Sequence, residues 1–380
     1  MFCKSYRPDT EVSIINYIAQ YPSSAFLYCG VVMVATLMAY RASLTPNTRA
    51  GKTSLLFLVL ILTLFSSLRG SSVGTDTAQY LSNIFYVQNM GSIRRLLEPG
   101  FDILVLFISF FIKDPQFVLV VIALIINGLI VKRLWMLRSQ ISFSYAIFIY
   151  TTTYYIMTFS GLRQWLAVSI IFFGSKYLFS LNYFKYVVTV IIASLFHNTS
   201  IFALILPILD MLSSKLKYRR QKLMFILLFF LGPLLVGGIV ILDSRTNLLS
   251  QYGGYFLQLR HFVGELSGGL MIWIKIIIGI FVWMSIQKSS LPNSDFRARV
   301  FNIYFLGLVV SFPGYYIANL ARIGWYFNIF ETIMFGLLAK DRSARARVLI
   351  IVITTLYILL FILEMVGSGR GHMPYIPFWK

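Results

Sequence analysis

Charged residues are scarce in this chain, and acidic residues are the scarcest of all. Only 12% of the 380 residues are charged, with 13 Asp and Glu against 33 Lys and Arg. A soluble domain carries about 25% charged residues. Because 58% of the chain is hydrophobic, a water-soluble core cannot hold all of its apolar side chains. Lipid must therefore be the solvent for much of the surface.

Cysteine and histidine are also rare, and familiar catalytic motifs are missing. Cys3 lies at the terminus and Cys29 within an apolar run, which indicates neither a disulfide framework nor a metal site. The chain contains no Walker A loop, HExxH, paired CxxC or GxSxG motif. We therefore expect chemistry that needs no metal and no cofactor.

Long apolar runs tile nearly the whole chain, so residues 1–380 are predicted to form one transmembrane domain. The first run lacks the basic start and cleavage site of a secretory signal, and we expect a retained span. The predicted spans are 24–40, 54–69, 115–131, 143–160, 162–180, 183–196, 198–214, 223–242, 268–286, 300–319, 323–339 and 348–366. The fold class is thus an all-α polytopic integral membrane protein with about 12 transmembrane helices.

Lysine and arginine cluster in loops that follow alternate spans. Arg41, Arg49 and Lys52 follow the first span, and larger clusters occur at 215–222 and 340–347. Because basic loops stay in the cytoplasm, we assign these loops to that side and expect both termini to face outward. The formal charge of +20 therefore reflects topology and does not indicate a nucleic-acid partner.

Residues 70–112 break the simple alternation of spans. The apolar segment 101–112 would extend only about 18 Å as a helix, too short to cross the membrane. The segment 77–97 is too polar to lie in lipid. We predict an outer hairpin in which helix 77–90 lies along the interface and 101–112 is half-buried or re-entrant, with a turn at 98–100.

The charges outside the basic loops gather at outer span ends, where topology requires none. Arg163 follows a break at 160–162 and is expected on the first turn of a helix. Arg322 belongs to a similar predicted outer turn at 319–322, and Arg69 is a weaker third candidate. A guanidinium group binds phosphate through a planar fork, whereas the alternative is snorkelling to lipid headgroups.

Two carboxylates and one histidine lie near the same outer ends. Asp76 is a candidate catalytic carboxylate, or else the cap of helix 77–90. Glu98 is a second candidate base, or a turn acceptor, and His197 could transfer a proton or serve a structural role. Lys275 and Glu331 lie inside predicted spans, where an ion is costly unless paired. They could pair with each other, or Lys275 could face the cavity, and we expect a structural role for both.

Several short sequence pieces stand in a fixed order between about residues 54 and 330. They are Arg69 through Asp76 to Tyr80, Glu98-Pro99-Gly100-Phe101, Gly161-Leu162-Arg163-Gln164, Phe196-His197-Asn198-Thr199-Ser200, and Arg322 with Tyr326. In this order they resemble the EpsG-like, Wzy-type polymerases of O-antigen and exopolysaccharide. The resemblance also implies a GT-C-like fold, in which an acidic residue of the first outer loop lies beside interfacial helices.

The resemblance implies an enzyme of the bacterial inner (cytoplasmic) membrane with its active site facing the periplasm. Its donor and acceptor would be glycans on undecaprenyl pyrophosphate, and its other partners membrane lipid and a chain-length regulator protein. In our hypothesis Arg163 and Arg322 bind the pyrophosphate, while Asp76, then Glu98, then His197 is the base, in one inverting displacement. The other predicted substrate-binding residues are Arg69, Tyr80, Gln164, Arg260 and Tyr326.

The predicted outer loop 243–267 contains Tyr252, Tyr255, Arg260 and His261, and its aromatic faces could stack on sugar rings. Three other functions stay open. A lipid-linked glycan flippase or transporter should show midplane charges and two related halves, whereas here the charges lie mainly at one face and no repeat is evident. An O-antigen ligase would use the same donor with a different acceptor. A sugar acetyltransferase would pair a histidine with an acid on the cytoplasmic side.

Overall fold

The computed structural model describes residues 18–94, 96–215, 266–287, 294–311, 318–366 and 371–380, and these residues form helices joined by loops, with one isolated β-bridge. The helices, in chain order, are α2 (Pro22–Leu44), α3 (Arg49–Ser67), α4 (Thr77–Met90), α5 (Pro99–Ser109), α6 (Pro115–Met136), α7 (Phe143–Ile149), η1 (Tyr150–Tyr154), η2 (Ile156–Phe159), α8 (Leu162–Phe179), α9 (Tyr183–Ser194), η3 (Asn198–Leu204), α10 (Ile205–Lys215), α13 (Leu266–Gln287), α14 (Ser294–Ser311), α15 (Ala318–Asn328), α16 (Glu331–Lys340) and α17 (Ala344–Val366).

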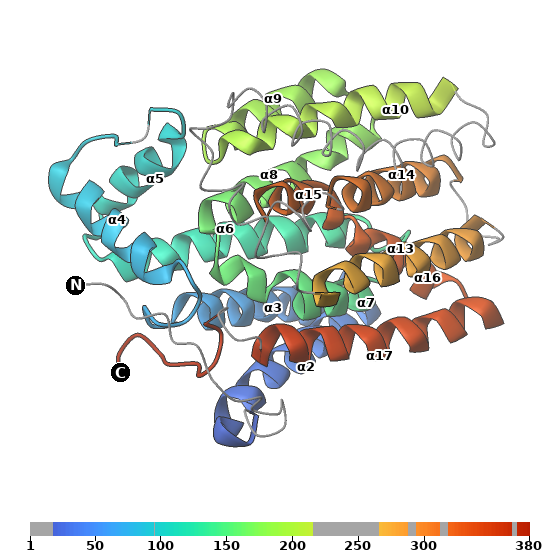
Figure 1. Ribbon diagram of the computed structural model, residues 1–380, viewed down its shortest axis with the longest axis horizontal. Coiled ribbons are helices and arrows are strands. Elements are labelled where there is room, and N and C mark those ends of the chain that lie inside the picture. The colour runs from blue at the N-terminus through green and yellow to red at the C-terminus, as the bar shows by residue number, and fades with distance from the viewer. Residues whose placement is uncertain (1–17, 95, 216–265, 288–293, 312–317, 367–370) are drawn as a thin grey trace.

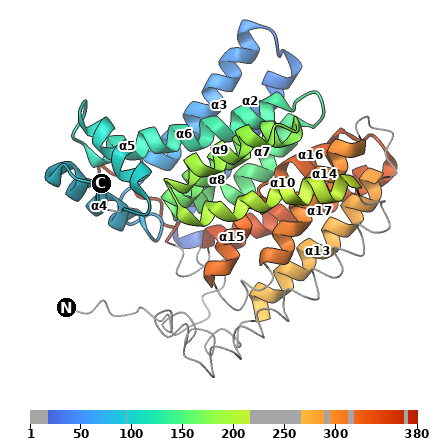
Figure 2. The ribbon, with the colours of Figure 1, turned by 90° about the horizontal axis from the view of Figure 1, so that it is seen from above.

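Most of the long helices run along the longest axis of the molecule, and α4 and α5 lie together at one end of it (Figure 1). The view from above shows the same arrangement, with α4 and α5 beyond the ends of α8 and α9 (Figure 2). These two helices occupy nearly the ranges that the sequence predicts for the outer hairpin. A proline starts α5 at a position where a missing N–H costs nothing. That the hairpin lies along a membrane interface stays a prediction.

Four described helices are long and apolar enough to cross a membrane, namely α2, α3, α6 and α17. Further apolar helices are shorter, including α9 and Ile274–Ile286 of α13. The predicted span 223–242 and the outer loop 243–267 lie outside the described residues. The multi-pass character is therefore clear, while the number of twelve crossings stays a prediction.

The predicted span 143–160 is helical over nearly its whole length but is not one continuous α-helix, and that it crosses the membrane stays a prediction. After α7 the chain forms a π-helical turn at Tyr150–Tyr154 and then the 3-10 helix η2. Threonine hydroxyls compete for helix carbonyls here, since Thr151 Oγ1 donates to Ile147 O (2.9 Å) and Thr152 Oγ1 to Phe148 O (2.8 Å). Such back-bonding often bends helices, and π-helical turns inside α-helices are frequent at functional sites.

Two basic residues, at the end of α6 and near the start of α14, bind partners inside the protein. Arg133 at the end of α6 donates to Ser175 of α8 (2.8 Å). Arg299 at the start of α14 pairs with Asp210 of α10, with Nε and Oδ1 3.1 Å apart. These contacts fix the end of α6 against α8 and the start of α14 against α10.

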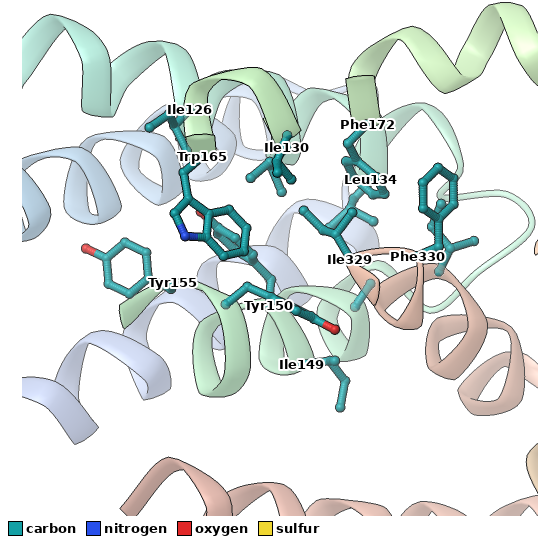
Figure 3. Close-up of a cluster of buried hydrophobic side chains, with 14 of the residues drawn as sticks. Ile126, Ile130, Leu134, Ile149, Tyr150, Tyr155, Trp165, Phe172, Ile329 and Phe330 are labelled. Atoms are coloured by element: carbon teal, nitrogen blue, oxygen red, sulfur yellow. The ribbon is translucent and has the colours of Figure 1, made fainter. Parts of the chain in front are cut away.

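The centre of the bundle is packed with aromatic side chains, and Figure 3 shows part of this core. Trp165 of α8 is fully buried and stacks on Trp325 of α15 with ring centroids 5.3 Å apart. Phe172 of α8 meets Phe330 edge to face at 5.3 Å. These contacts join α8 to the α15–α16 region and fix the position of the first turn of α8 relative to α15.

A charged pair lies inside the bundle, as the sequence predicts. Lys275 Nζ of α13 is 3.3 Å from Oε2 of Glu331, whose side chain is fully buried at the start of α16. The hydroxyl of Tyr154 also donates to Oε2 (2.9 Å). The pair therefore links α13, α16 and the π-helical turn.

Removing only the acid of this pair should destabilise the protein more than removing both charges. We expect Glu331→Leu to cost about 3–5 kcal/mol, because Lys275 is left as an uncompensated charge. The double variant Lys275→Met/Glu331→Leu should recover most of that loss. Thermal unfolding of the detergent-solubilised protein measures this, with Lys340→Met on the exposed end of α16 as the control. Equal stability of Glu331→Leu and the wild type would contradict the structural role.

Candidate active site

A polar cavity of about 230 Å³ lies at the α4–α5 end of the bundle. Its lining comes from α4, the start of α8, the α9–η3 junction and α15. The lining residues are Asp76, Gln79, Tyr80, Asn83, Gly161, Arg163, Gln164, His197 and Arg322. Residues from distant parts of the chain thus meet where the predicted outer charges gather.

Gly161 makes the sharp entry into α8, and Asp76 holds it. Gly161 has a positive φ of 69°, a conformation that glycine adopts without strain. Its N–H donates to Asp76 Oδ2 (2.9 Å), while the Thr75 hydroxyl donates to Oδ1 (3.1 Å). The Asp76 side chain does not cap α4, so the capping alternative was wrong. Asp76 instead joins α4 to α8 and borders the cavity.

Glu98 connects three elements behind the cavity. Its Oε2 accepts a hydrogen bond from Nη1 of Arg163. Its Oε1 lies 2.8 Å from Nδ1 of His197 and accepts the backbone N–H of Asn198 (3.0 Å). Both carboxylate oxygens are therefore engaged by groups from outside the hairpin, and Glu98 accepts no hydrogen bond from the described residues of its own turn.

The charge on Glu98 is stabilised by these contacts. Burial raises the pKa of its carboxyl, but the hydrogen bonds from His197 and Asn198 and the charge of Arg163 outweigh it and lower the pKa to about 2. The ordinary value is 4.5. Glu98 is therefore a carboxylate at neutral pH and holds protons too weakly to serve well as a base.

The turn that carries Glu98 is fastened to the α9–η3 junction by backbone contact. Gly100 N–H donates to the carbonyl of Leu195 (2.8 Å). A Cβ at Gly100 would lie only 2.9 Å from that carbonyl oxygen, so a side chain does not fit. The close approach explains the glycine after Pro99, because the two backbones must touch for Glu98 to reach His197.

Arg163 lies on the first turn of α8, as the sequence predicts. Its Nη1 is bound to Glu98, whereas its Nε is buried without a hydrogen-bond partner among the described residues. The guanidinium thus retains donor capacity at the cavity. The N-terminus of α8 adds partial positive charge at the same place, so this wall of the cavity favours an anion.

Arg322 borders the same cavity, but it does not lie in a turn, and that part of the prediction was wrong. It belongs to α15, which runs from Ala318 to Asn328. Gln164 Nε2 donates to the Arg322 carbonyl (2.7 Å), joining the first turn of α8 to the second turn of α15. The Arg322 side chain is exposed, lies over the Trp325 ring at 5.9 Å, and has no carboxylate partner in the described part of the chain.

Arg69 does not border the cavity, and its predicted substrate contact needs correction. Only 1% of Arg69 is exposed. Its Nε donates to Thr77 Oγ1 (3.1 Å), Nη2 to the Phe159 carbonyl (3.1 Å) and Nη1 to the Ser66 carbonyl. Every guanidinium nitrogen is thus used inside the protein, where Arg69 joins the end of α3, the start of α4 and η2.

The other predicted contacts divide by position. Tyr80 and Gln164 border the cavity. Tyr326 is fully buried behind the cavity, and its hydroxyl lies 3.1 Å from Thr199 Oγ1. Its predicted substrate contact therefore needs correction, because the side chain packs inside the protein. Arg260 lies outside the described residues.

Sequence reasoning missed Gln79 and Asn83 as site residues. Both border the cavity from α4. Their spacing of four residues places them on one face of the helix, and this was the available signal. Amide side chains both donate and accept hydrogen bonds, which suits them to the hydroxyl groups of a polar ligand.

No cluster of three or more His, Cys, Asp or Glu side chains that could hold a metal ion occurs among the residues that the structure describes. Chemistry without a metal or cofactor stays a prediction.

Fold and site together define a multi-pass helical membrane protein with an arginine-bearing polar cavity at one end. Residues 52–378 match the EpsG family, and the chain belongs to this family. The family is one of glycosyltransferase-like membrane polysaccharide polymerases. Comparison with curated proteins and with solved structures found no match.

Proposed function

We propose that this protein is a Wzy-type polymerase that joins oligosaccharide repeat units carried on undecaprenyl pyrophosphate, the donor and the acceptor both being lipid-linked. The cavity would face the periplasm of a bacterial inner membrane, because the sequence assigns the basic loops to the cytoplasm and the residues of the cavity to the outer ends of the spans. The observation that carries the proposal is that Arg163 and Arg322, from separate helices, border one cavity.

The two arginines suit the leaving group of this reaction. When the glycosidic bond to pyrophosphate breaks, the bridging oxygen keeps the electron pair and the lipid pyrophosphate gains negative charge. Fixed guanidinium groups stabilise charge that develops in the transition state, and their planar fork matches phosphate oxygens. The α8 N-terminus beside Arg163 adds to this field.

His197 is the best-placed base in this proposal. Its Nδ1 faces the Glu98 carboxylate at 2.8 Å, which leaves Nε2 to accept the proton of the attacking sugar hydroxyl. A carboxylate behind an imidazole holds its orientation and stabilises the imidazolium that forms. Glu98 then acts by positioning, since its own pKa of about 2 makes it a weak base.

Asp76 takes a binding role beside His197. Each of its oxygens accepts one hydrogen bond within the protein, from Gly161 and Thr75, and each retains capacity for another. With Gln79 and Asn83 it would orient acceptor hydroxyls. One displacement at the anomeric carbon inverts its configuration, forms the new glycosidic bond and releases undecaprenyl pyrophosphate.

A flippase or a ligase is the alternative function, and the product of the purified protein distinguishes the three. In nanodiscs supplied only with repeat units on undecaprenyl pyrophosphate, a polymerase yields lipid-linked dimers and longer chains and releases undecaprenyl pyrophosphate. A ligase forms no product until its separate acceptor is added, and a flippase forms none at all. In cells, deletion of the gene should leave single repeat units where the wild type makes a ladder. The proposal would be refuted if no dimers formed in nanodiscs and the deletion strain still made a normal ladder.

A further inference from the structure

The segment after α17 returns to the cavity end and pairs with the loop that leads into α4 (Figure 1). Gly74 N–H donates to the Gly371 carbonyl (2.7 Å), and Gly70 N–H to the Ile376 carbonyl (2.7 Å). Phe378 N–H donates to the Leu68 carbonyl (2.9 Å), next to an antiparallel bridge between residues 69 and 377. The backbone of residues 371–378 thus covers loop 68–74 along its length.

Side chains fasten this segment to α2 and α3. The Tyr375 ring stacks on Phe65 with centroids 4.4 Å apart, and its hydroxyl donates to the Phe65 carbonyl (2.8 Å). Tyr375 N–H donates to Ser24 Oγ (3.0 Å), and the Tyr28 hydroxyl to the His372 carbonyl (2.7 Å). The segment is therefore part of the packed bundle, not a loose tail.

The covered loop delivers Asp76 to the cavity. Arg69 holds the loop from the inside through Thr77 and the Phe159 carbonyl. Residues 371–378 supply the acceptors for the N–H groups of Gly70 and Gly74. Without these acceptors the loop would lose backbone partners that buried groups require. The position of Asp76 and the first turn of α4 therefore depends on a segment almost 300 residues later in the chain.

We propose that residues 371–378 form a strap that positions the Asp76 loop for catalysis, although the strap adds no residue to the cavity. The proposal rests on the function proposed above, because it names what supports that site. Arg163 and Arg322 lie on α8 and α15 and are not held by the strap. Weakening the strap should therefore disturb the acceptor side of the cavity and leave pyrophosphate binding intact.

Tyr375 variants test the strap through kcat and KM. Tyr375→Ala should lower kcat about tenfold or more, since small misplacements of catalytic groups are costly, while KM for the lipid-linked donor stays within about twofold. Tyr375→Phe keeps the stack on Phe65 and should rescue most of the activity. Trp379→Ala, which alters an exposed ring beyond the strap, is the control. A wild-type kcat in Tyr375→Ala would overturn the proposal, as would an equal loss of donor binding.

A labelling experiment keeps the strap testable even if the protein is not a polymerase. Val73 is fully buried in the loop, and Val73→Cys in a Cys3→Ser/Cys29→Ser background gives a single thiol. Its reaction with a water-soluble maleimide should be slow when the strap is intact and about tenfold faster in Tyr375→Ala, because local opening exposes it. Unchanged labelling in Tyr375→Ala would show that the strap does not hold the loop.

Discussion

Replacing Arg322 or Arg163 by alanine should stop chain extension while the protein still inserts and folds. In the proposed mechanism each arginine contributes donors to the departing pyrophosphate, and removal of one such donor typically lowers kcat by about 10² to 10³. Arg322→Ala is the cleaner variant, because its side chain has no carboxylate partner among the described residues. In cells the expected result is single repeat units in place of a ladder.

Arg163 needs a second variant, because its removal also leaves Glu98 without a charged partner. Arg163→Lys keeps a cation beside Glu98 but lacks the planar fork, and we expect it to fold normally and remain inactive. The matched control for Arg322→Ala is Arg138→Ala. Arg138, like Arg322, lies over a tryptophan ring, but it follows the end of α6 and does not border the cavity. Normal ladders from both Arg163→Lys and Arg322→Ala would refute the role assigned to the arginines.

Replacing His197 by glutamine should lower kcat by about 10² to 10⁴, the usual contribution of a general base. Glu98→Gln should lower kcat as well, because the imidazole loses the carboxylate that orients it at 2.8 Å. If Glu98 acts mainly through His197, the double variant should be little worse than His197→Gln alone. Steady-state kinetics on the nanodisc-embedded protein measure all three variants.

Asp76→Asn separates the two candidate bases. The amide of asparagine can still accept the Gly161 N–H with its oxygen, so the start of α8 should keep its place. We expect a weaker effect on kcat from Asp76→Asn than from His197→Gln. The reverse order would make Asp76 the base, as the sequence alone favours, and would reduce His197 to a partner of Glu98.

The sequence predicts much of the α4–α5 end correctly, for physical reasons that act locally. The polar face of residues 77–90 cannot lie in lipid, and the break before Arg163 interrupts an apolar run. These features predict an outer hairpin and an arginine on the first turn of a helix, and the structure contains a helix over each range. The sequence also indicates that Lys275 and Glu331 could form an ion pair, because a charged side chain within a span needs a partner.

Other site features could not be inferred, because they depend on which distant groups become neighbours. Arg69 looks like Arg163 in the sequence, since both arginines lie near the ends of apolar runs. Arg69 is buried because Thr77 and the Phe159 carbonyl surround it. Glu98 looks like a general base until His197 and Arg163 are seen to occupy its oxygens.

Composition alone decides that this chain enters a bilayer. A chain that is 58% hydrophobic and 12% charged has more apolar surface than a water-soluble fold can bury. Tertiary structure decides which polar groups meet. Only folding brings residues 76, 163, 197 and 322 around one cavity and lays residues 371–378 against loop 68–74. Hydropathy is a property of each segment by itself, so it can be read from the sequence. A hydrogen bond or an ion pair requires that two distant segments lie next to each other in the folded protein.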